Sequence, residues 1–142
     1  MKALIAARKI KVCPVVTQQT EHGTQILLFR HPLAGIQLVK GTLEPDDASI
    51  LTAAVRELAE EAGITAVEQL QYLGQWQSRH QDQLWHFVHC HCPSLPQQWV
   101  HHCLDDGGHD FEFFWQPLNT AIIGDSHPVF QRAVEYIRSV LL

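Results

Sequence analysis

The stretch Arg56-Glu57-Leu58-Ala59-Glu60-Glu61-Ala62-Gly63-Ile64 carries the strongest structural signal in this 142-residue chain. It ends a segment in which apolar residues recur every three to four positions, the spacing of one helix face. At about 100° per residue, Glu57, Glu60 and Glu61 fall within a sector of roughly 100° beside that face. The apolar residues are Ile50, Leu51, Ala54, Val55, Leu58 and Ala62. The sequence therefore predicts a helix that gathers three carboxylates beside its buried side and ends at Gly63.

The three acidic side chains call for a positive partner. Like charges three and four residues apart on a helix repel by about 0.2–0.5 kcal/mol per exposed pair. Arg56, four residues before Glu60, is one candidate partner, and a divalent cation is the other. Carboxylates without a nearby thiolate suit a hard ion such as Mg²⁺ or Mn²⁺, which shares phosphate oxygens with a substrate. The alternative is an acidic helix face that is merely solvated.

A glycine-containing segment, Lys40-Gly41-Thr42-Leu43-Glu44-Pro45, lies just before this helix. With it, the sequence resembles the Nudix hydrolase family, whose box reads G-x5-E-x7-R-E-U-x-E-E-x-G-U, with U a bulky aliphatic residue. The second half of the box is matched at every specified position from Arg56 to Ile64.

The first half of the box departs from the family pattern. One residue too many separates Gly41 from Arg56, and the box glutamate is replaced by Asp47 or, counting back from Arg56, by Ala48. We place the extra residue in the loop around Asp46 and Asp47, because an insertion within the helix would turn the earlier part of its apolar stripe by about 100°.

The resemblance implies an α/β (α+β) fold, the Nudix-type α/β/α sandwich with a mixed central sheet. It also implies a metal-dependent pyrophosphohydrolase that cleaves a nucleoside diphosphate linked to another moiety X. Glu57, Glu60 and Glu61 would ligate Mg²⁺ or Mn²⁺, with the Gly41 carbonyl as a further ligand. Glu57 would also orient or deprotonate water, and Arg56 would hold the Glu60 carboxylate in place.

Other residues are candidates for supporting roles in the site. Family members often add an acidic residue from a later strand or loop. Glu112 ranks first here, ahead of Asp110, and Asp105 or Asp106 could substitute. The cations that flank the glycine segment, Arg30 and Lys40, are candidates for binding the phosphates of the substrate.

Hydrophobic patterns predict the remaining elements. Lys9–Val16 and Gln25–Phe29 are expected to form a β-hairpin around a polar turn at His22-Gly23. A second strand pair is expected between Tyr72 and Cys92, around the polar break from Ser78 to Gln83. Phe111–Trp115 is expected to be a strand. Asp46 or Asp47 is expected to cap the first helix, and a second helix should run from Pro128 to the C-terminus.

Composition limits the functional class. No repeat or linker divides the chain, so residues 1–142 are expected to form one domain. With a net charge of −5 and 10 Lys plus Arg, the chain is not expected to bind duplex nucleic acid. No apolar run is long enough for a membrane span, and the run from Ala3 to Ala7 after Lys2 is too short for a secretory signal. A cytoplasmic location is therefore expected, and the resemblance to the Nudix family implies a small-molecule nucleotide substrate. Many members of the resembled family are dimers, so a homodimer is left open.

Two other functional hypotheses remain. The altered first half of the box is compatible with a Nudix-like module that binds a nucleotide for regulation and is catalytically weak or inactive. The segments His89-Cys90-His91-Cys92 and His101-His102-Cys103 contain zinc-ligand types. On a strand, however, the histidines of the first segment face away from its cysteines. Buried reduced thiols are the expected alternative to zinc.

Overall fold

The fold is that of a computed structural model, which describes residues 9–142. The segment from Lys2 to Ala7, on which the secretory-signal expectation rests, lies outside the described residues. The first sheet has the strand order β5-β1-β7-β6 and the second the order β2-β3-β9-β8, with β4 beside β3. The strands are β1 (Lys9–Val15), β2 (Thr17–Thr20), β3 (Gly23–His31), β4 (Gly35–Gln37), β5 (Gly41–Thr42), β6 (Gln69–Gln77), β7 (Gln83–His91), β8 (Gln98–Cys103) and β9 (His109–Pro117).

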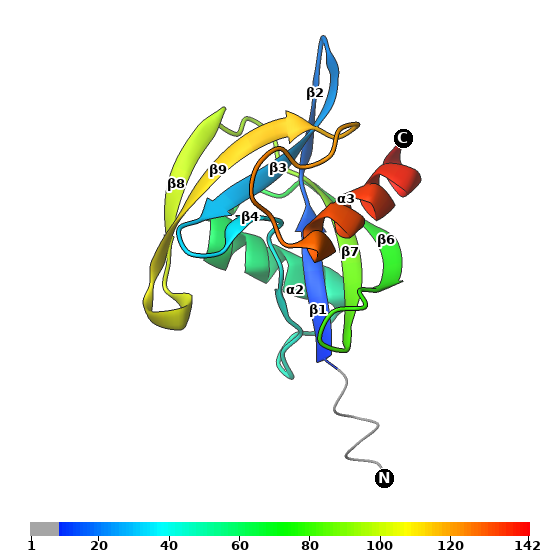
Figure 1. The fold of residues 1–142 in the computed structure, drawn as a ribbon. Coiled ribbons are helices and arrows are strands. Elements are labelled where there is room, and N and C mark those ends of the chain that lie inside the picture. Colours follow the sequence, from blue (N-terminus) through cyan, green and yellow to red (C-terminus); the bar gives the residue numbers. More distant parts are fainter. Residues whose placement is uncertain (1–8) are drawn as a thin grey trace.

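Two longer helices lie on opposite sides of β1 and β7, as Figure 1 shows. The first, α2 (Ile50–Glu57), continues into a π-helical turn, η1 (Leu58–Ala62). The second, α3, spans Pro128–Leu141, as predicted. A short 3-10 turn, η2 (Asp105–Gly107), connects β8 to β9. The mixed α+β architecture is confirmed.

The first sheet is mixed because β1 runs parallel to β7 and antiparallel to β5. Its central strands are buried on both faces. Along β1, Val12 packs in the core with α2, whereas Cys13 and Val15 pack in the core with α3. Along β7, Cys90 faces the first core and Phe87 the second. This alternation follows from the period of two in a strand, and it separates two apolar layers.

The expected hairpin between Lys9–Val16 and Gln25–Phe29 is wrong in its first strand. The hairpin forms between β2 and β3, with Thr20 opposite Gly23, while β1 joins the other sheet. A single hydrogen bond from Leu27 N to Val16 O, of 2.9 Å, connects the end of β1 to β3. The polar turn is therefore where the pattern placed it, but the pattern does not specify that β1 pairs with a strand some 70 residues away.

The other strand predictions are confirmed. Strands β6 and β7 form an antiparallel pair from Gln69 opposite His91 to Gln77 opposite Leu84. The predicted strand at Phe111–Trp115 is the centre of β9. Among residues 9–142, no helix combines the length and the apolar character that crossing a bilayer requires.

Candidate active site

Helix α2 begins at a cap that the sequence analysis assigned incorrectly. Its N-cap is Ser49, whose Oγ accepts a hydrogen bond of 3.1 Å from the Thr52 N–H. The predicted caps, Asp46 and Asp47, precede it in the loop. Asp47 instead accepts two hydrogen bonds from Arg56, so its carboxylate is not available to the helix terminus. Ser49 is an equally good capping residue and lies one residue before the helix.

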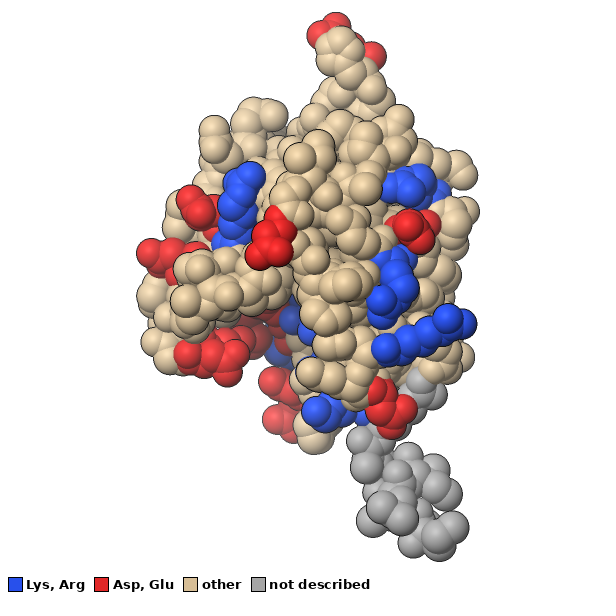
Figure 2. Space-filling model, viewed as in Figure 1, with Lys and Arg blue, Asp and Glu red and all other residues tan. Residues whose placement is uncertain are grey.

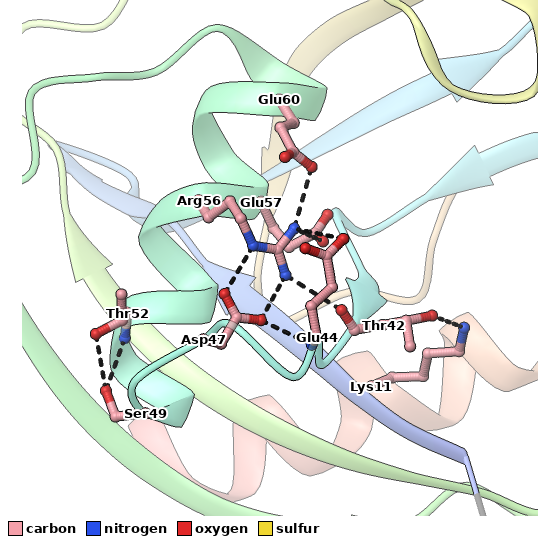
Figure 3. Close-up of polar contacts among 9 residues, drawn as sticks. All are labelled: Lys11, Thr42, Glu44, Asp47, Ser49, Thr52, Arg56, Glu57 and Glu60. Atoms are coloured by element: carbon pink, nitrogen blue, oxygen red, sulfur yellow. Dashed lines mark hydrogen bonds and ion pairs between the residues drawn. The ribbon is translucent and has the colours of Figure 1, made fainter.

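Arg56 connects this loop to the acidic residues of the helix (Figure 3). Its Nε and Nη2 donate to Oδ1 and Oδ2 of Asp47, both at 2.8 Å. Its Nη1 donates to Glu57 Oε1 at 2.7 Å and to Glu60 Oε2 at 3.1 Å. These bonds hold the pKa of Asp47 at about 2, chiefly through the hydrogen bonds from Arg56 and with help from the Glu44 backbone. Arg56 therefore fixes carboxylates both before and within the helix.

The carboxylate of Glu57 lies directly against the backbone of Gly41. A Cβ atom built on Gly41 would overlap the Glu57 carboxyl group. The side chain of Glu57 is only 5% exposed. Glycine at this position therefore allows β5 and α2 to approach closely enough for Glu57 to sit over the strand backbone.

Glu57 and Glu61 form a buried carboxyl pair. The side chains hydrogen-bond to each other, and the two residues are 4% and 8% exposed. Burial, followed by the hydrogen bond and charge of Glu57, raises the pKa of Glu61 to about 10. Glu57 already has Arg56 as its cationic partner at 2.7 Å, so Glu61 is the member of the pair that favours the protonated form.

The third acid of the motif, Glu60, is held apart from this pair. Its side chain is 45% exposed and contacts Arg56. The π-helical turn explains the separation, because it contains more residues per turn than an α-helix. Residues three apart, such as Glu57 and Glu60, therefore diverge more than in an α-helix, whereas residues four apart, such as Glu57 and Glu61, stay on one face. Of the three carboxylates predicted to lie together, Glu57 and Glu61 are close to each other, and Glu60 lies apart from them on Arg56.

A polar cavity of about 250 Å³ opens beside Glu61. Figure 2 shows Asp and Glu side chains around a hollow in which Lys or Arg atoms are also visible. The residues that line the cavity are His31, Gln37, Lys40, Glu61, Cys103, Asp105, Asp106, His109 and Phe111. The cavity therefore combines one buried acid of the helix with a cation and two further acids.

Lys40 reaches this cavity from a mostly buried position. Its Nζ lies 5.3 Å from the ring centroid of Trp85 and 5.7 Å from that of Phe130. Burial lowers the pKa of Lys40, with a further contribution from Lys11, while Glu61 opposes the shift. A cation anchored by two rings beside an acidic pair is well placed to meet an incoming anion.

The structure does not bring Arg30 and Glu112 into this group. The two residues are cross-strand neighbours of β3 and β9, and both side chains are exposed. Phe29 and Phe113 point toward α2, so Arg30 and Glu112 point to the opposite face of their sheet. Asp105, which the sequence analysis named as a substitute, lines the cavity, and its charge acts on both Glu60 and Glu61.

Comparison with known proteins decides the family. The model of the NUDIX domain matches residues 8–136. The chain belongs to the Nudix family. The expectation of a Nudix-type hydrolase domain is thereby confirmed at the level of the family. A comparison with curated proteins finds no match.

Solved Nudix structures share the fold. The NUDIX domain of Shewanella oneidensis NrtR, crystallised with ADP ribose, superposes with a TM-score of 0.71 at 18% identity, over 96% of this chain and 90% of that one. An ADP-ribose pyrophosphatase from Streptococcus suis gives 0.64 at 18% identity, over 94% and 92%. A MutT from a study of Aliivibrio salmonicida and Vibrio cholerae enzymes gives 0.64 at 18% identity, over 93% and 98%.

Nudix hydrolases generally use divalent metals, and the residues of this Nudix chain fit such an ion in part. Within residues 9–142, no three His, Cys, Asp or Glu side chains are already gathered as a ligand set. The buried carboxyl groups of Glu57 and Glu61 nevertheless interact, and this interaction and their burial favour the protonated form of Glu61. Oxygen donors with an excess of negative charge suit a hard cation, which would replace that proton. The charge of Asp105 raises the pKa of both Glu60 and Glu61, so Asp105 is a further acid close to this group.

The cysteine and histidine segments are separated in the way that the strand geometry predicts. Cys90, Cys92 and Cys103 are buried in the core beside α2, and burial raises the pKa of Cys90 to about 12 and that of Cys92 to about 11. His89 contacts Thr17 Oγ1 at 2.8 Å, and His102 contacts Asp110 at 2.7 Å. Within the described part of the chain, these thiols and imidazoles do not share a metal site.

Proposed function

We propose that this Nudix protein is a Mg²⁺- or Mn²⁺-dependent pyrophosphohydrolase that cleaves a nucleoside diphosphate linked to another moiety. The observation that carries the proposal is the buried Glu57–Glu61 pair at a cavity that also contains Lys40. Burial beside Glu57 disfavours the ionised form of Glu61, a form that a bound cation would stabilise, and the cavity offers both a cation and acids to a polyphosphate. These features match the chemistry of the family that the domain model identifies.

Glu57, Glu60 and Glu61 would hold the ion, with the carbonyl of Gly41 as a further ligand. When bound, the ion neutralises the pyrophosphate oxygens and lowers the pKa of the attacking water. Glu57 keeps one oxygen on Arg56 Nη1 at 2.7 Å, which fixes the direction of the other toward the site. In this proposal Glu57 orients the water and accepts its proton, and Lys40 binds a phosphate of the substrate.

Glu112 and Arg30 have no role in this proposal, because their side chains lie on the other face of the sheet. Asp105 takes the role of the acid outside the motif. It lines the same cavity as Glu61, from the turn that follows β8. From there Asp105 can ligate an ion or receive a proton.

A nucleotide-binding module without turnover is the second candidate. The extra residue between Gly41 and Arg56 favours it, because the first half of the box differs from the family pattern. The NrtR NUDIX domain, which is similar in fold, was crystallised with ADP ribose. ADP-ribose is therefore the first ligand to test for either candidate.

The deciding experiment incubates the purified protein with ADP-ribose, dinucleoside polyphosphates and oxidised nucleoside triphosphates, with Mg²⁺, with Mn²⁺ or with EDTA. We expect metal-dependent release of a nucleoside monophosphate. Glu57→Gln and Glu61→Gln should lower kcat by about 10³-fold, since each removes several kcal/mol of charge stabilisation. Glu112→Gln is the matched control and should retain activity. Saturable ADP-ribose binding without product at any metal concentration would establish the binding module instead.

A small nucleotide is the proposed ligand, and the net charge of −5 weighs against duplex nucleic acid as a general partner. The cytoplasmic location, the single-domain organisation and the homodimer stay predictions of the sequence. Sedimentation of the full chain, with and without DNA, tests the homodimer and the expected lack of DNA binding together.

A further inference from the structure

The π-helical turn η1 is an unfavourable conformation that something in the tertiary structure must stabilise. Turns of this kind are rare, usually short, and found at functional sites. Here the Ile64 N–H donates to Leu58 O at 3.2 Å. Because Gly63 ends the helix, the carbonyl of Glu60 is one of the last four in it and needs a donor from outside the helix.

His101 of β8 contacts this carbonyl. Its Nε2 lies 3.0 Å from Glu60 O, with the geometry of a hydrogen bond in which the ring nitrogen donates. Gly63 makes the approach possible, since a Cβ on that residue would lie 2.7 Å from His101 Nδ1. Gly63 also adopts the left-handed conformation, with φ of 71°, that ends the helix. The glycine of the motif thus serves both the helix end and the contact with His101.

Trp99 makes the second contact from the same strand. Its Nε1 donates to Ala62 O at 3.0 Å, at the last residue of the π-helical turn. Its ring stacks on Phe113 with centroids 5.0 Å apart and an interplanar angle of 10°. Because Phe113 is fully buried in the core beside α2, Trp99 is anchored to the sheet and not merely to the helix.

We propose that Trp99 and His101 are positioning residues that hold η1 against β8, fix the placement of Glu60 and Glu61, and thereby set the affinity of the carboxylate site for its divalent cation. The metal part of this inference rests on the proposed function. The two side chains touch backbone carbonyls of the turn that carries Glu60 and Glu61. Without these donors the carbonyls of Glu60 and Ala62 lose their hydrogen-bond partners on β8, and the turn frays, which displaces the carboxylates of Glu60 and Glu61.

Conservative variants test the hydrogen-bond donors of Trp99 and His101 while keeping most of the volume of each side chain. Trp99→Phe keeps the stack on Phe113 and removes the N–H. His101→Leu removes the ring donor, and His101→Gln keeps an N–H donor. His102→Leu is the matched control, because His102 lies on the opposite face of β8 and contacts Asp110. Calorimetric titration with Mn²⁺ alone is the first readout, and amide hydrogen exchange at Ile64 is the second.

We expect Trp99→Phe and His101→Leu to raise the Mn²⁺ dissociation constant by about 10- to 100-fold, the range observed for partners that orient metal ligands. His101→Gln and His102→Leu should bind Mn²⁺ like the wild type. At saturating Mn²⁺ the kcat of all four variants should stay close to the wild-type value, because none of these side chains touches the substrate. Unchanged Mn²⁺ affinity in both Trp99→Phe and His101→Leu overturns the proposal.

Hydrogen exchange separates this inference from the proposed function. If the wild type binds Mn²⁺ but cleaves nothing, the enzymatic proposal fails and the affinity comparison still decides the positioning role. If the wild type binds no divalent cation, the link to metal is overturned. Faster exchange of the Ile64 amide in Trp99→Phe and His101→Leu, but not in His102→Leu, then supports the claim that the two side chains hold the turn η1 in place. Unchanged exchange in both variants overturns that claim as well.

Discussion

The guanidinium of Arg56 donates two hydrogen bonds to the carboxylate of Asp47, with Nε–Oδ1 and Nη2–Oδ2 distances of 2.8 Å. Counted from Gly41, Asp47 stands where the family pattern has glutamate. The shorter aspartate still reaches Arg56, because Asp47 also closes a turn with Glu44, whose N–H donates to Asp47 Oδ2 at 2.8 Å. The altered first half of the box therefore keeps a carboxylate on Arg56.

Asp47→Asn should lower the unfolding midpoint at neutral pH by several degrees and should mobilise Arg56. The pKa of Asp47 is held at about 2, below its ordinary value, so its stabilising contribution is complete above about pH 4. That contribution is lost as the pH falls toward 2. Urea unfolding should show a lower free energy of unfolding for the variant than for the wild type at pH 7 and at pH 4. This difference should become smaller only between pH 4 and pH 2.5. Asp46→Asn, at an exposed neighbouring position, should show no such difference at any pH.

Glu61→Gln should stabilise the metal-free protein while abolishing activity. The pKa of Glu61 is raised to about 10, so the native protein keeps this proton while the unfolded chain loses it above about pH 4, and the resulting loss of stability grows as the pH rises toward 10. A glutamine at this position does not ionise, so in EDTA the stability of Glu61→Gln relative to the wild type should increase from pH 5 to pH 9. Thermal unfolding midpoints measure this difference, with Glu112→Gln as the control. Added Mn²⁺ should raise the midpoint of the wild type but not that of Glu61→Gln. An advantage independent of pH would contradict the assignment of this proton to Glu61.

Gly41→Ala should destabilise the protein by about 1–3 kcal/mol, the usual cost of overpacking a close contact. The added methyl would occupy the space of the Glu57 carboxyl group. Chemical denaturation measures the loss, and the background variant Glu57→Asp tests its cause. Because aspartate is one methylene shorter, Gly41→Ala should cost less in that background. An equal loss of stability from Gly41→Ala in the wild-type and Glu57→Asp backgrounds would show that the added methyl does not act through the Glu57 carboxyl group.

Lys40→Met should raise KM for the substrate by about tenfold or more while leaving the fold intact. Methionine preserves most of the apolar contact with Trp85 and Phe130 but removes the charge that meets phosphate. A hydrogen bond to a charged group contributes about 1.5–3 kcal/mol, which corresponds to this change. Arg30→Met is the matched control, since Arg30 lies over Phe114 on the other face of the sheet. Initial-rate kinetics should show KM unchanged for that control.

Asp105→Asn should lower kcat by about 10²- to 10⁴-fold if Asp105 is the acid that supports proton transfer. The same measurement on Glu112→Gln should give the wild-type rate. Asp106→Asn is a stricter comparison, because Asp106 lines the same cavity from the next position in η2. Equal loss in Asp105→Asn and Asp106→Asn would point to the charge of the cavity and not to one catalytic carboxylate.

The elements that the sequence predicted well are those specified by short-range patterns. Helix α3 starts at Pro128 and follows its apolar stripe, and β6 and β7 pair across the polar break. The pairing of β1 was not predictable in this way. The residue pattern of β1 is compatible with a strand of an edge hairpin and with a central strand. Its place at the centre of the sheet depends on pairing with Phe87 and neighbouring residues of β7, which are distant in the sequence.

By itself, the sequence determined the helix with three acids, its end at Gly63 and the family of the protein, because each depends on residues within one or two turns of one another. The tertiary structure decided which acids act together. It supplied the donors of Trp99 and His101 that accompany a π-helical turn, buried Glu61 against Glu57, and left Glu60 half-exposed on Arg56. It also placed Asp105 at the cavity and turned Glu112 away. The physical reason is that burial and strand pairing are set by residues far apart in the chain, whereas helical periodicity is local.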